Sequence, residues 1–97
     1  MFQIVDIIQV SRGFAQRYPG SLQEGLWIVL DPEQTGHTPV PVQGQVVTIS
    51  RPDGSSLEAE LQGAERLQGA ARFRAVLALH FRSLRRGVVP MQSTVAW

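Results

Sequence analysis

Cysteine, lysine and asparagine are all absent from the 97 residues of this chain. Without cysteine the chain has no disulfide framework, no thiolate nucleophile and no cysteine-based zinc site. Small secreted domains often depend on disulfides, so their absence favours a reducing compartment. All basic side chains other than the two histidines are arginines. An arginine at one position is therefore no sign that arginine was preferred there over lysine.

Long apolar runs are missing as well, and we expect that the opening residues are not a signal peptide. No stretch approaches the roughly 20 apolar residues that a membrane-spanning helix needs. The opening MFQIVDIIQV lacks a basic region, and Gln3, Asp6 and Gln9 interrupt its apolar residues, which is unlike a signal peptide. We therefore expect a cytoplasmic protein, and the length fits one domain over residues 1–97.

The residue patterns of common enzymes are also missing. The sequence has no G-x-x-x-x-G-K-[ST] phosphate loop and no G-x-S-x-G nucleophile elbow. Asp31, Glu33 and His37 lie close together, but their spacing is that of an ordinary turn and not of a zinc or calcium site. The sequence therefore predicts no enzyme activity, no metal and no cofactor, with chemistry at His37 or His80 as a minor alternative.

Alternation of apolar and polar residues is the main pattern that is present, and it predicts strands. In Ala71–Arg82, five apolar residues from Phe73 to Phe81 share one face, while the arginines and His80 share the other. Four further strands are predicted, with a last short one inside Val88–Trp97: Phe2–Val10, Leu26–Leu30, Gln45–Ser50 and Leu57–Leu61. Ser21–Leu30 and Leu57–Leu67 also fit helices.

Turn residues separate these runs. Pro52-Asp53-Gly54 predicts a hairpin between Gln45–Ser50 and Leu57–Leu61, and Pro39–Pro41 predicts an extended loop. Glu58 and Glu60 then lie on the polar face of a strand, where pairing with Arg72 or Arg74 is possible. Short strands at even spacing predict an all-β fold, and we place a small closed or nearly closed antiparallel barrel of about six strands ahead of a sandwich.

Four segments, in order, resemble the second domain of translation-factor GTPases of the elongation factor Tu type. They are Phe2–Gly13, ending in Arg12-Gly13; Val42–Ile49, where a strand follows Gly44; Leu61–Glu65; and Ala75–Val89, containing Arg86-Gly87-Val88. The resemblance implies a Greek-key-like barrel, which in that family works beside a GTPase domain and contacts tRNA or ribosomal RNA. The chain has no phosphate loop, so no nucleotide-driven function is implied, and no functional residue is transferred.

Charge is distributed unevenly along the chain. Residues 66–97 contain six arginines and no acidic residue, whereas residues 1–65 contain three arginines and eight acidic residues. A basic face of this kind can contact phosphates, and it can equally be a solubilising surface neutralised by nearby acids. The candidate RNA-binding residues are Arg72, Arg74, His80, Arg82, Arg85 and Arg86.

Two functions are consistent with these observations. The first is a non-enzymatic binding module that contacts RNA or a ribonucleoprotein through the arginine-rich face. The second is a protein–protein interaction or structural module with no nucleic-acid role, which would meet its partner through the barrel edge or the Pro39–Pro41 loop, with Leu84 or Trp97 as apolar anchors.

Overall fold

The computed structural model describes residues 1–13, 23–67 and 76–97, and seven strands lie in these ranges. They form one antiparallel sheet in the order β4-β3-β7-β1-β2-β6-β5, so the predicted all-β class is confirmed. The strands are β1 (Phe2–Val10), β2 (Gly25–Leu30), β3 (Val46–Ser50), β4 (Ser56–Glu60), β5 (Gly63–Leu67), β6 (Val76–Phe81) and β7 (Thr94–Ala96). The described ranges also contain the short helix α2 (Pro32–Thr35) and the 3-10 turn η1 (Arg86–Val88).

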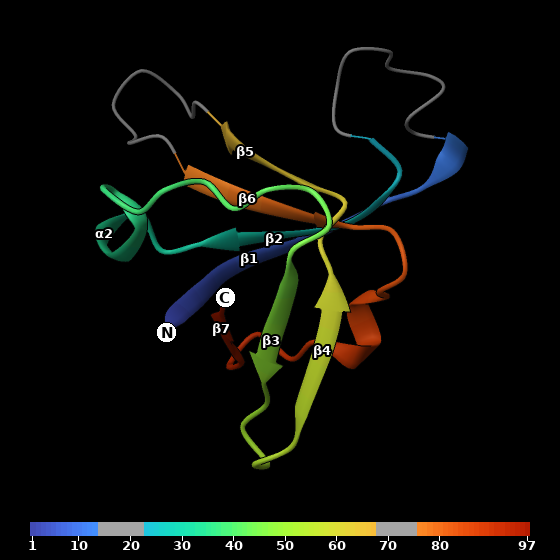
Figure 1. Cartoon of the computed structure of the whole chain (residues 1–97). Coiled ribbons are helices and arrows are strands. Elements are labelled where there is room, and N and C mark those ends of the chain that lie inside the picture. Colours follow the sequence, from blue (N-terminus) through green and yellow to red (C-terminus); the bar gives the residue numbers. More distant parts are fainter. Residues whose placement is uncertain (14–22, 68–75) are drawn as a thin grey trace.

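The first strand organises the sheet because it has different partners at its two ends. Its start pairs with β7, where Phe2 is opposite Val95, and the rest pairs with β2 as far as Val10 opposite Gly25. The β1–β2 register shifts between Ile4 and Asp6, and a shift of this kind bends a strand. Figure 1 shows the outcome: β3 and β4 run at a steep angle to β2, β5 and β6.

Strand β2 is buried along its whole length, which explains its uninterrupted apolar sequence. Leu26, Ile28 and Leu30 belong to the main core, whereas Trp27 and Val29 belong to a second apolar cluster. Because successive side chains of a strand point to opposite faces, both faces of the sheet are covered at β2.

The two edge strands, β4 and β5, follow one another in the chain and are separated by Leu61 and Gln62 alone. Leu61 continues the β3–β4 ladder, since its N–H donates to the Gln45 carbonyl at 2.9 Å. The Gln62 N–H instead donates to the carbonyl of His80 on β6 at 2.8 Å. The chain thus passes directly from one edge of the sheet to the other, although no ladder between described residues joins β4 to β5.

Most local predictions hold. The hairpin at Pro52-Asp53-Gly54 is confirmed, with Gly54 at φ +90°, and strands occupy the segments for which a helix was the alternative, over 25–30 and within 57–67. The strand predicted for Ala71–Arg82 is confirmed over Val76–Phe81, while residues 71–75 lie outside the described ranges. Among the residues described, no helix is long and apolar enough to cross a bilayer.

Candidate functional site

An open cleft of about 670 Å³ lies at the corner of the sheet where β1 ends and β2 begins. Its described lining comes from three separate parts of the chain: the end of β1 and the residues after it, the start of β2, and the segment that follows β6. The lining residues are Gln9, Val10, Ser11, Arg12, Glu24, Gly25, Arg82 and Arg85. We call this feature the arginine cleft.

Antiparallel pairing explains why these segments meet. Val10, the last residue of β1, is opposite Gly25, the first residue of β2. The next residue of β2, Leu26, is opposite Phe81, the last residue of β6. One end of the sheet therefore brings together the end of β1, the start of β2 and the end of β6. Arg12, Glu24 and Arg82 follow or precede these strand ends in the chain.

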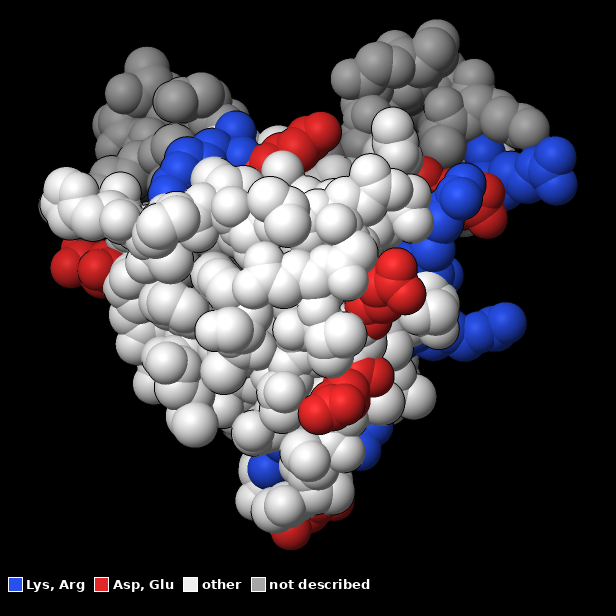
Figure 2. Space-filling view, viewed as in Figure 1, with Lys and Arg blue, Asp and Glu red and all other residues white. Residues whose placement is uncertain are grey.

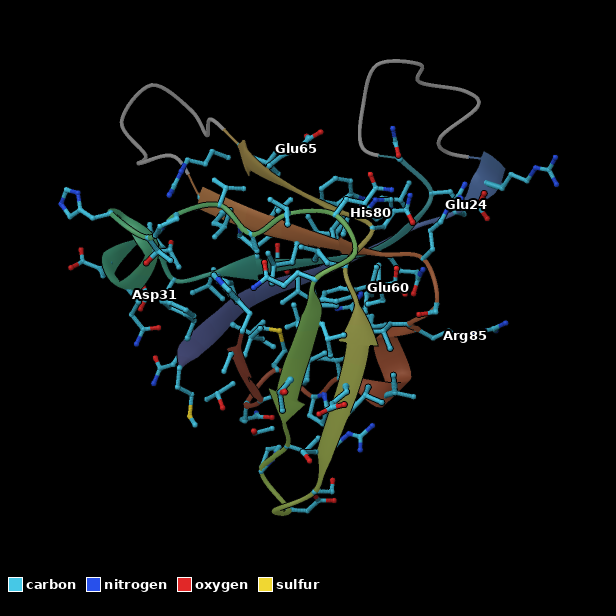
Figure 3. The ribbon with its side chains drawn as sticks, viewed as in Figure 1. Glu24, Asp31, Glu60, Glu65, His80 and Arg85 are labelled. Atoms are coloured by element: carbon cyan, nitrogen blue, oxygen red, sulfur yellow. The ribbon has the colours of Figure 1, made fainter. Side chains whose placement is uncertain are left out.

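The charge of the arginine cleft is positive, because its described lining holds three arginines and one glutamate. Within the ranges the structure describes, neither a carboxylate nor a carbonyl oxygen bonds to the guanidinium groups of Arg12, Arg82 and Arg85. All three residues are exposed. Figure 2 shows blue arginine side chains along the right-hand flank of the molecule, and Figure 3 places Glu24 and Arg85 on this flank.

Two other arginines have a different, structural role. Arg51 donates from Nε to the carbonyl of Val88 at 2.9 Å, and Arg66 donates to the carbonyls of Thr35 and Thr38. These hydrogen bonds connect segments that are distant in the sequence. Arg51 and Arg66 are therefore occupied by the fold, which sets them apart from the arginines of the cleft.

The predicted RNA-binding residues are divided by the structure. Arg82 and Arg85 line the arginine cleft. Arg86 is exposed beside it, and its backbone N–H donates to Gln9 Oε1 at 3.1 Å. Arg72 and Arg74 lie outside the described residues.

The prediction that His80 faces solvent with the arginines is wrong. Its side chain is 2 % exposed and stacks on Trp27, with ring centroids 4.4 Å apart and planes 4° apart. His80 does share the face opposite Phe81, as the alternation predicts, but the second apolar cluster covers that face. The sequence carried one indication that this face is buried: Val76 and Ala78, on the same face as His80, have apolar side chains.

Arg12 was missed by the charge argument because it belongs to the acidic half of the sequence. In the fold it lies with Arg82 and Arg85, which belong to the basic half. The sequence placed Arg12 only in the turn that ends the first predicted strand, and a net count over residues 1–65 concealed it.

The remaining candidates have ordinary structural roles. The Asp31 carboxylate caps α2 by accepting from the Glu33 N–H at 2.9 Å, and the described ranges hold no cluster of three potential metal ligands. Leu84 and Trp97, considered above as anchors for a protein partner, pack instead against the main core. The predicted pairing of Glu58 and Glu60 with Arg72 or Arg74 involves residues outside the described ranges.

Comparisons with models of known protein families, with curated proteins and with solved structures find no match for this chain. Evidence on function therefore comes from the chain's own residues. In the described part of the chain, the fold brings the charged groups of the arginine cleft together, and the three guanidinium groups bond to no carboxylate or carbonyl oxygen there.

Proposed function

We propose that this domain is a non-enzymatic binding module that contacts the phosphate backbone of RNA, free or in a ribonucleoprotein, through the arginine cleft. One observation carries the proposal: three exposed guanidinium groups from separate parts of the chain line one open cleft, and no carboxylate of the described residues bonds to them. Arginine suits this role because its planar guanidinium stays charged and donates two parallel hydrogen bonds to a phosphate.

The position of Arg82 favours a chain-like ligand over a single small anion. Arg82 lines the arginine cleft and also a second hollow of about 220 Å³, together with Gln43, Glu60 and Gln62. A strand of RNA carries one phosphate per nucleotide, so neighbouring phosphates of one strand would follow the surface from Arg12 and Arg85 toward Arg82. Arg86 belongs to the same proposal as an outer contact. Arg72 and Arg74 stay candidate RNA-binding residues on the sequence argument alone.

The proposal includes a fold relationship. The direct passage of the chain from β4 to β5 at Leu61–Gln62 supports a nearly closed, Greek-key-like barrel of the kind implied by the resemblance to the second domain of translation-factor GTPases. In a barrel of this kind, strand ends and loops gather at the two ends of the barrel. The arginine cleft lies at such a group of strand ends.

The test is binding of the purified protein to a fluorescently labelled single-stranded RNA at two salt concentrations. The affinity should fall steeply with salt, with a slope in log Kd against log salt of about 0.7 for each phosphate contact. Arg82→Gln should weaken binding about tenfold, equivalent to about 1.4 kcal/mol, and lower that slope by about 0.7.

A matched control is Gln92→Glu, which changes the net charge by the same one unit at an exposed position outside the arginine cleft. It should leave binding nearly unchanged. Equal losses in Arg82→Gln and Gln92→Glu would reduce the effect to net charge and reject the cleft. Absence of binding at low salt would reject the RNA function and favour the protein-interaction alternative, for which Val40 and Val42 are exposed beside Pro41.

A further inference from the structure

Glu24 is an unexpected residue in a cleft for phosphates. It is the only carboxylate among the described residues that line the arginine cleft. A carboxylate near a bound phosphate repels it, and this repulsion lowers the affinity that the three arginines provide. A favourable contact of Glu24 with the ligand must therefore involve a group other than a phosphate.

Two buried rings hold the backbone on which Glu24 lies. The His80 Nε2 atom is 2.8 Å from the Glu24 carbonyl oxygen, and the Trp27 Nε1–H donates to the Gln23 carbonyl oxygen at 2.9 Å. A carbonyl oxygen only accepts, so Nε2 of His80 carries the proton in this hydrogen bond. His80 and Trp27 are 2 % and 3 % exposed and stack on each other, which fixes the two donors.

The next residue, Gly25, makes this close approach of the backbone to His80 possible. Gly25 has φ +133°, and a Cβ atom there would lie 2.7 Å from His80 Nε2 and 2.8 Å from the Phe81 carbonyl oxygen. The absence of a side chain at Gly25 lets the Glu24–Gly25 backbone approach His80 closely. His80 has no role in the proposed phosphate contacts. Its hydrogen bond instead holds the Glu24–Gly25 backbone, which lines the arginine cleft.

We propose that Glu24 accepts a hydrogen bond from a ribose 2′-hydroxyl and so selects RNA over DNA, with His80 and Trp27 as positioning residues. This inference rests on the proposed function. An ionised carboxylate accepts hydrogen bonds and donates none, and the 2′-hydroxyl is the donor that RNA carries and DNA lacks. With DNA, Glu24 would lose water without gaining a partner, and it would still repel the phosphate.

The experiment compares single-stranded RNA, DNA and 2′-fluoro RNA of one sequence by fluorescence anisotropy at low salt. We expect RNA to bind about tenfold more tightly than DNA. The 2′-fluoro RNA keeps an RNA-like sugar but has no 2′ donor, so it should bind like DNA. If it binds like RNA, the protein reads the shape of the sugar and the role of Glu24 is rejected.

The variant Glu24→Ala should reduce the RNA-to-DNA preference to about one, mainly by improving DNA binding. An equal gain for RNA and DNA would show that Glu24 acts only through repulsion, which overturns the inference. The matched control is Glu58→Ala, which removes an exposed carboxylate of β4 that does not line the arginine cleft. It should leave the preference at the wild-type value.

The positioning role is tested at His80. His80→Phe keeps an aromatic ring beside Trp27 but removes the donor to Glu24, so we expect a reduced RNA preference with an unchanged salt slope. His80→Gln, whose amide can donate in place of Nε2, should restore part of the preference. If His80→Phe does not fold, Glu24→Ala and the 2′-fluoro RNA still decide the inference.

The outcomes separate this inference from the proposed function. Binding that depends on Arg82 but shows no RNA preference would reject the role of Glu24 and leave the phosphate contacts in place. No binding of any of the three oligonucleotides would reject both.

Discussion

Gly25 offers the strongest test of how the cleft wall is built. Replacing it with alanine adds one methyl group at a backbone φ of +133°, a region that residues with a Cβ atom rarely adopt. The strain of such a conformation is about 1–3 kcal/mol. The new Cβ would also lie 2.7 Å from His80 Nε2 and 2.8 Å from the Phe81 carbonyl oxygen, and overpacking of this kind costs a further 1–3 kcal/mol or so.

We therefore expect Gly25→Ala to lower the free energy of unfolding by about 4 kcal/mol. In a domain of this size a loss of 1 kcal/mol lowers the melting temperature by about 4–8 °C, so the expected decrease is about 15–30 °C. The assay is thermal and urea unfolding followed by circular dichroism, together with tryptophan fluorescence in a Trp97→Phe background, where the signal comes from Trp27 and reports on its stack with His80.

Two other glycines are matched controls that separate strain from contact. Gly54 has φ +90° with nothing near its hypothetical Cβ, so Gly54→Ala should cost only the strain, about 1–2 kcal/mol. Gly63 has an ordinary φ and open space, so Gly63→Ala should be neutral or slightly stabilising. If Gly25→Ala costs no more than Gly54→Ala, the close packing of Gly25 against His80 and Phe81 is refuted.

Two further predictions concern other parts of the fold. The pKa of Asp53 lies below its ordinary value of 3.8, because the Ser55 hydroxyl and the Ser55 N–H both donate to its carboxylate. The stabilising contribution of this turn should be complete above the unfolded-state pKa and should be lost as the pH falls through the folded-state pKa. An NMR titration should show the lowered midpoint, and Ser55→Ala should raise it; an unchanged midpoint would contradict the hydrogen bonds. Phe2 and Trp97 stack with centroids 4.7 Å apart, so a double-mutant cycle with alanine should give a coupling of about 1 kcal/mol, whereas additive effects would exclude the stack.

Local patterns in the sequence were sufficient for most of the strands. Ile- and Val-rich runs located β1 and β2, alternation located β6, and the turn residues Pro52-Asp53-Gly54 located the β3–β4 hairpin. These signals depend on adjacent residues. The described residues contain seven strands where about six were predicted, because residues 57–67 hold parts of two strands, β4 and β5, with only Leu61 and Gln62 between them. Helix α2 was not predicted, since its four residues are too few for a helical period.

The candidate site depended on contacts that are distant in the sequence. Alternation placed His80 and Phe81 on opposite faces of one strand, yet only the fold shows that an apolar cluster with Trp27 covers the His80 face. The sequence alone identified the basic half of the chain, but it could not join Arg12 to Arg82 and Arg85. The pleat of a strand depends on adjacent residues alone. The exposure of a side chain to water and the distance between charged groups depend on which strands pair, and the tertiary structure decides that pairing.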